Sequence, residues 1–197
     1  MADKERISGN LPSWLPIRTE RLELRILTHE DIRKWSRTAD DTEVNRYLAS
    51  AGRTFGIGNP DRVYRQIEES YRSLSALHLG IFLHGGEEII GLCSFQRWDA
   101  RGGKAELGFA LSHEYWGKGY ATEAAAALAD FGFEHLELER IQARCFVKNA
   151  ASLRVLAKIG MERQHRPEFG FGVKRRDDEL GVVVFTLTPE KLKENQA

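Results

Sequence analysis

The 197-residue sequence lacks several features that would point to particular classes of protein. It has two cysteines, Cys93 and Cys145, far apart in apolar stretches, so we expect buried free thiols in a reducing cytoplasm rather than a disulfide or a metal pair. No His, Cys or Asp cluster has the spacing of metal ligands, so we predict no metal site. Internal repeats and low-complexity segments are also missing.

An excess of charge and a long apolar run are missing too. Lys plus Arg and Asp plus Glu number 29 each, and because neutralising phosphates needs surplus basic residues, we do not expect nucleic-acid binding. No run of about 18 apolar residues predicts a membrane span. The charged start, Met1 to Arg6, has no apolar core behind it, which disfavours a secretory signal. We therefore expect a globular, cytoplasmic protein.

The patterns that are present predict one mixed α/β domain. We expect residues 1–16 to form a loosely ordered N-terminal arm and residues 17–197 a single domain, because the chain is short for two. Alternating or apolar runs predict strands over residues 19–27, 78–83, 88–95, 105–111, 140–147, 161–165 and 181–187. Caps and four-residue apolar spacing predict helices starting near Thr28, Pro60, Tyr120 and Asn149.

The most informative stretch is a glycine turn, Gly117-Lys118-Gly119, between a predicted strand and an alanine-rich helix. Glycines at such a junction let backbone N–H groups approach an anion, and the helix N-terminus adds a favourable dipole. Thr122 could add a hydroxyl. The stretch is neither a Walker loop nor a dinucleotide fingerprint, whose third glycine is replaced by Thr122. Spacing alone leaves an anion site and a plain capped turn open.

The string Trp116-Gly117-Lys118-Gly119-Tyr120-Ala121 resembles the acyl-CoA pyrophosphate loop of the GNAT acetyltransferase superfamily, Gln/Arg-x-x-Gly-x-Gly/Ala, with Trp116 at the Gln/Arg position. Three further stretches, residues 19–25, 105–109 and 149–161, resemble the branch that acetylates ribosomal-protein N-termini (Rim-type). The resemblance implies an α/β (α+β) single-domain GNAT-like fold. Its mixed, mostly antiparallel twisted sheet would have about six to seven strands, flanked by about four helices.

The resemblance also implies an activity. A primary amine, in the first place a protein N-terminus of the ribosomal-protein type, would attack acetyl-CoA directly, with no metal. A small-molecule amine (an amino acid, polyamine or aminoglycoside) remains an alternative acceptor, and a non-catalytic acyl-CoA sensor an alternative function. Residues 40–61 and 167–179 are expected to shape the acceptor pocket. The oligomeric state stays open, a homodimer included.

Candidate catalytic residues follow from the same resemblance. Many members place a Tyr seven residues after the Asn of the last motif, where this chain has Leu156. Ser152, at the position of the Rim-type branch's proposed general acid, is therefore the candidate to protonate the departing thiolate; otherwise it is an ordinary first-turn serine. Asn149 is a candidate both for the helix N-cap and for contact with the pantetheine arm.

Glu106 is the candidate base. Strand alternation puts it on one face with Gly108 and Ala110, whose lack of bulk predicts an open cleft beside the carboxylate. A carboxylate there could take the proton of the amine through water. The alternative is a solvent-facing strand residue.

The candidate cofactor-binding residues are implied by the same resemblance and lie in three segments. The backbone of the predicted strand would pair with the pantetheine amides, and Lys118, Arg154 and Lys158 would meet nucleotide phosphates unless they are ordinary surface charges. The full set is Phe109, Ala110, Leu111, Trp116, Gly117, Lys118, Gly119, Tyr120, Ala121, Thr122, Asn149, Arg154 and Lys158.

Overall fold

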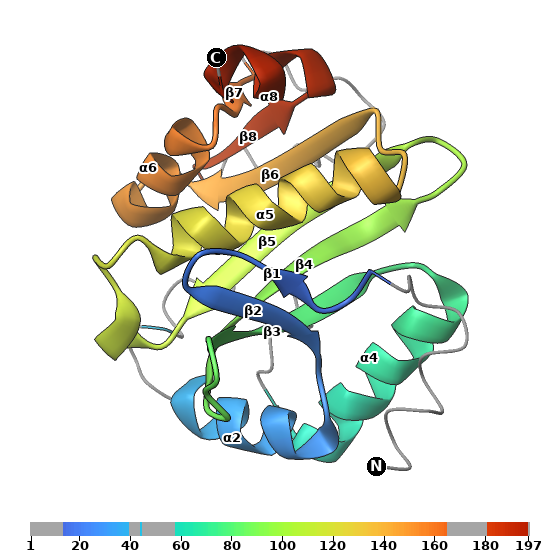
Figure 1. Cartoon of the computed structure of the whole chain (residues 1–197), viewed down its shortest axis with the longest axis vertical. Helices are drawn as coiled ribbons and strands as arrows, with labels where there is room; N and C mark the ends of the chain where they lie inside the picture. The colour runs from blue at the N-terminus through green and yellow to red at the C-terminus, as the bar shows by residue number, and fades with distance from the viewer. Residues whose placement is uncertain (1–13, 40–43, 45–57, 165–180, 197) are drawn as a thin grey trace.

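The structure, a computed structural model, describes residues 14–39, 44, 58–164 and 181–196 (Figure 1). Its elements in chain order are β1 (Ile17–Arg18), β2 (Leu22–Ile26), α2 (His29–Ala39), α4 (Pro60–Ser73), β3 (Leu77–Leu83), β4 (Ile89–Asp99), β5 (Lys104–Leu111), the 3₁₀ helix η2 (His113–Tyr115), α5 (Tyr120–His135), β6 (Arg140–Phe146), α6 (Ala150–Lys158), β7 (Glu162–Arg163), β8 (Val182–Leu187) and α8 (Pro189–Gln196).

The strands form one eight-stranded sheet in the order β1-β2-β3-β4-β5-β6-β8-β7. Neighbouring strands run antiparallel except β5 and β6, which are parallel. A parallel pair needs a long crossover, and α5 lies in that connection. The predicted mixed, mostly antiparallel single domain is confirmed.

The structure contains two elements that the sequence pattern does not predict, a strand and a helix. Strand β1 has two residues, too few for an alternating pattern to register. Helix α8 reads PEKLKENQ and has Leu192 as its one apolar residue, so it shows no apolar periodicity. Pro189 at its first position was the available signal. The described part of the chain therefore has eight strands and five α-helices, against about six to seven and about four.

Local chemistry explains where the other helices start. At α2, Thr28 Oγ1 accepts from the Asp31 amide and Asp31 Oδ2 accepts from the Thr28 amide, a reciprocal cap that fixes the first turn. Ile32 and Trp35 on this helix are fully buried, as predicted. At α4, Asn59 Oδ1 accepts from the Arg62 amide at 3.1 Å.

Helix α5 lies against the sheet along β5 (Figure 1). Its small residues allow close packing: a Cβ added to Gly132 would lie 2.6 Å from Cζ of Phe95. Ala124, Ala125 and Ala129 are fully buried. The alanine-rich stretch that follows the glycine turn thus brings the start of α5 close to the end of β5. Both cysteines are buried free thiols, as expected.

Candidate active site

The two parallel strands, β5 and β6, pair with each other along only part of their length. Strands β5 and β6, both described in full, pair only from Lys104 with Arg140 to Glu106 with Gln142. Beyond that point, residues 107–111 of β5 pair with β4 alone, and residues 143–146 of β6 pair with β8 alone. The strands therefore diverge like a fork, and among the described residues no strand pairs with this edge of β5 beyond Glu106.

A cavity of about 460 Å³ lies at this fork. Its walls come from the end of β5, the start of α5, the end of β6 and helix α6. Most predicted site residues line it: Phe109, Ala110, Leu111, Trp116, Gly117, Gly119, Ala121, Thr122, Asn149, Ser152, Arg154 and Lys158. Lys118, Tyr120 and Glu106 are not among its lining residues. The sequence segments that were singled out separately thus meet in one place.

The loop before α5 presents backbone amides. Gly117 and Gly119 have φ of +74° and +84°, a left-handed conformation that glycine adopts without strain. Within the described residues, the first backbone amide here with a carbonyl partner is that of Glu123, which donates to Gly119 O; those of residues 117–122 have none. Amides grouped at a helix N-terminus make a site for an anion.

Trp116, which departs from the family's usual Gln or Arg, ties the loop to β5. Its indole Nε1 donates to the carbonyl of Leu111 at 2.8 Å. The ring of His113 packs edge-on against it, with centroids 4.8 Å apart. The substitution therefore removes a polar side chain and adds a contact that holds the loop against the end of the strand.

Asn149 is the N-cap of α6, as predicted: its Oδ1 accepts from the Ser152 amide at 3.0 Å. This leaves the amide nitrogen of Asn149 available to donate elsewhere. Ser152 lies in the first turn of the same helix and lines the cavity. Leu156 is buried, so the position where many relatives carry a Tyr is apolar here.

The wall that β6 and the residues after it provide has no counterpart in the prediction from the sequence. Ala143, Arg144, Cys145 and Lys148 line the cavity, because the parallel pairing brings the end of β6 opposite the end of β5. Burial raises the pKa of the Cys145 thiol to about 11, so it stays protonated at neutral pH. The available signal was the strand–helix–strand order, which favours parallel neighbours.

Glu106 departs from its prediction. Instead of facing an open cleft, its side chain is buried and ion-paired with two arginines, Arg97 and Arg144. Arg144 Nη2 lies 3.0 Å from Glu106 Oε2. Arg97 reaches the carboxylate from an irregular stretch of β4, where its own φ is +47°. Alternation placed Glu106 on a face but could not reveal partners on two other strands.

The segments predicted to shape the acceptor pocket lie mostly outside the described residues. This applies to residues 167–179 and to 40–57 apart from Val44, which lines the cavity. Most of the predicted N-terminal arm also lies outside the described residues. Of the part that is described, the Trp14 ring stacks on the His135 ring, with the ring centroids 4.8 Å apart. No helix in the described ranges is long and apolar enough to cross a membrane.

The lining of the cavity offers groups for a ligand that carries an anionic group. The loop amides offer donors at one end, the free edge of β5 offers main-chain groups along the middle, and Ser152 and Asn149 offer a hydroxyl and an amide on the facing helix. The described residues contain no group of three or more His, Cys, Asp or Glu side chains that could hold a metal ion.

Comparison with known proteins agrees with this geometry. Residues 21–162, more than half of the chain, match the acetyltransferase (GNAT) domain family. The uncharacterized N-acetyltransferase p20 of Bacillus licheniformis is 32% identical over 146 residues, which cover 74% of this chain and 82% of that protein. The chain belongs to the GNAT family and is an acetyltransferase.

Two solved structures share the fold. RimJ of Mycobacterium smegmatis, in complex with CoA-disulfide, has a TM-score of 0.69 at 23% identity and covers 87% of this chain and 83% of its own. Spermidine N-acetyltransferase of Vibrio cholerae, in complex with CoA and spermine, has a TM-score of 0.72 at 18% identity and covers 89% and 99%. At these identities the similarity shows the fold and does not choose between acceptors.

Proposed function

We propose that the chain transfers an acetyl group from acetyl-CoA to a primary amine, and that the cavity at the fork holds acetyl-CoA. The observation that carries this proposal is the continuity of the site: the unpartnered edge of β5 leads to the amides of residues 117–122. The pyrophosphate would bind those amides, and the pantetheine arm would pair with residues 107–111. Two structures of the same fold are complexes with CoA-disulfide and with CoA, which supports CoA as the class of ligand.

In the proposed reaction, the neutral amine attacks the thioester carbonyl. A C–N bond forms and the C–S bond breaks, so the amine must lose a proton and the thiolate must gain one. We propose Ser152 as the donor to the thiolate, because this residue lines the cavity and Leu156 closes the alternative position. Asn149, while capping α6 through Oδ1, would donate from its amide to the pantetheine arm.

We propose that Glu106 serves the acceptor side, as a base acting through water. Its Oε2 is held by Arg97 and Arg144, whereas Oε1 accepts one hydrogen bond, from Arg144 Nε at 3.2 Å, so this oxygen would be the one that takes the proton. The Arg97 side chain is half exposed, which makes it the contact that solvent or an arriving acceptor can displace. If Oε1 takes no proton, Glu106 instead fixes Arg144 on the cavity wall.

For the acceptor, we propose a protein N-terminus, and the cytoplasm as its location. The support is the stretch from Thr19 to Arg25, which resembles the Rim-type branch. A polyamine or another small amine is the second candidate, because a spermidine acetyltransferase shares the fold.

An acceptor screen tests the proposal. Thiol release from acetyl-CoA is followed with peptides beginning in Ala or Ser, with the same peptides blocked at the N-terminus, and with spermidine, amino acids and an aminoglycoside. We expect turnover with the free N-termini only, and mass spectrometry should locate the acetyl group on the α-amine. Turnover with spermidine alone would replace the protein acceptor by a small one. Acetyl-CoA binding with no turnover on any acceptor would support a sensor.

A further inference from the structure

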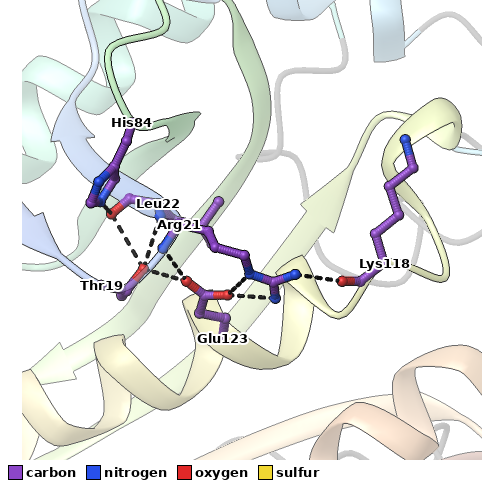
Figure 2. Close-up of polar contacts among 6 residues, drawn as sticks. All are labelled: Thr19, Arg21, Leu22, His84, Lys118 and Glu123. Atoms are coloured by element: carbon purple, nitrogen blue, oxygen red, sulfur yellow. Dashed lines mark hydrogen bonds and ion pairs between the residues drawn. The ribbon is translucent and has the colours of Figure 1, made fainter.

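A polar cluster outside the cavity joins the N-terminal strands to the loop before α5 (Figure 2). At its centre is the Glu123 carboxylate in the first turn of α5. Oε1 accepts from the Thr19 hydroxyl at 2.6 Å and from the Arg21 amide at 2.9 Å, and Oε2 accepts from Arg21 Nε at 2.6 Å. The remaining arm of the Arg21 guanidinium, Nη1, donates to the carbonyl of Lys118 at 3.0 Å.

This cluster fixes one peptide unit of the loop. In a trans peptide, the C=O and the N–H point in opposite directions. Because Arg21 holds the Lys118 carbonyl, the N–H of Gly119, which belongs to the same peptide unit, points away from Arg21. Gly119 lines the cavity, whereas Arg21 and Lys118 are not among its lining residues. The contact therefore fixes the direction of the backbone amide at Gly119, a residue that lines the cavity.

The cluster also balances charge next to the loop. An unpaired Glu123 carboxylate would repel a phosphate bound at the start of the same helix. Arg21 neutralises this charge, because its Nε and Nη2 both contact Oε2 of Glu123. Burial raises the pKa of the Glu123 carboxyl, yet the hydrogen bonds from Thr19 and Arg21 outweigh burial and lower it overall. The Arg21 guanidinium also lies over the Tyr120 ring, 4.7 Å from its centroid, which restrains it further.

We propose that Arg21 is a positioning residue for the CoA pyrophosphate: held by Glu123 and Thr19, it fixes the 118–119 peptide unit so that the Gly119 amide is already directed at the phosphate. The inference rests on the proposed function, because it takes the ligand of the loop to be CoA. It deepens that function by making part of the cofactor affinity depend on a turn between the first two strands, outside the cavity.

The test compares two conservative variants. Arg21→Lys keeps the charge and the backbone amide that donates to Oε1, but it cannot hold Oε2 with two nitrogens and the Lys118 carbonyl with a third, as the planar guanidinium does. Arg25→Lys is the matched control: Arg25 lies four residues further on, in β2, donates to Gly86 O at 3.2 Å and covers the Phe82 ring at 3.6 Å, away from the loop. Calorimetry measures the Kd of each protein for CoA and for pantetheine, which lacks the pyrophosphate.

We expect Arg21→Lys to bind CoA roughly 10-fold more weakly and pantetheine as the wild type does. In turnover, KM for acetyl-CoA should rise while kcat at saturation stays the same. Arg25→Lys should match the wild type for both ligands. Thr19→Val removes the hydroxyl donor to Glu123 and should also weaken CoA binding, by about 2–3-fold. If Arg21→Lys does not fold, this variant tests the inference instead.

Three results would overturn the inference. Unchanged CoA affinity in Arg21→Lys would show that the loop holds its geometry unaided. Equal losses for CoA and pantetheine would show a general structural role. If the wild type bound no CoA, the proposed function itself would fail and this inference with it, a result distinct from the first two because it appears before any substitution is made.

Discussion

His78 should make the stability of this protein depend on pH. It lies on β3 with 4% of its surface exposed, and its Nε2 has no hydrogen-bond partner in the described structure. Its backbone carbonyl is engaged, because the Tyr71 hydroxyl donates to it. Burial disfavours the charged ring and lowers the pKa of His78 from 6.5 to about 4. The folded protein therefore holds this ring neutral at pH 5, where the unfolded chain holds it protonated.

The sign follows from which state binds the proton. Between pH 6.5 and 4 the unfolded chain binds more protons than the folded one, so the free energy of unfolding falls as the pH falls through this window and is fully present above it. With these two pKa values, the loss between pH 8 and pH 5 is about 2 kcal/mol, and the whole window is worth about 3 kcal/mol. That is a sizeable share of the stability of a single domain.

Urea unfolding at pH 8, 6.5 and 5, followed by tryptophan fluorescence, measures this loss. His78→Gln removes the titrating ring and should flatten the pH dependence by about 2 kcal/mol relative to wild type, whatever it does to stability at pH 8. His113→Gln, at an exposed histidine, is the control and should keep the wild-type slope. If wild type and His78→Gln lose the same free energy between pH 8 and pH 5, the buried ring is not the cause.

Three further predictions concern the site. Gly119→Val places a branched side chain at a φ of +84°, so CoA affinity should fall at least roughly 10-fold by calorimetry; an unchanged Kd would remove the loop from the binding site. Ser152→Ala should lower kcat by roughly 10–1000-fold with acetyl-CoA affinity retained, and wild-type turnover where chemistry is rate-limiting would exclude a general acid there. Glu106→Gln should lower kcat/KM for the amine and shift the pH–rate profile without changing acetyl-CoA binding; an unaltered profile would leave Glu106 a purely structural partner of its arginines.

Much of the fold was predictable because its signals are local. Helix α5 begins at Tyr120, as the glycine turn and the alanine run predict, and α4 begins at Pro60, as its Asn-Pro start indicates. Strand β1 and helix α8 were not predictable in this way. The first is defined by pairing with β2, and the second has too little apolar surface to leave a periodic trace.

In the candidate site, too, the local features were predictable and those that depend on tertiary pairing were not. The loop could be predicted because its glycines, strand and helix are contiguous. The cavity wall formed by Ala143 and Arg144 could not, since it depends on where β5 and β6 stop pairing. Glu106 is the clearest case of a contact that the sequence does not predict. Arg144 lies 38 residues from Glu106 in the sequence, and Arg97 reaches the Glu106 carboxylate from a bulge that an alternating pattern does not predict.

The amides at the start of α5 bear on how freely this protein can change. Every residue except proline carries an N–H, so the side chain of Lys118, which does not line the cavity, can be exchanged without removing a donor. Replacement is restricted where the backbone path itself is special, at Gly117 and Gly119, or where a side chain holds that path, at Trp116 and Arg21. Substitution scanning of the loop should therefore find tolerance and intolerance alternating along a few consecutive residues. The pattern would record the shape of the main chain rather than the chemistry of the side chains.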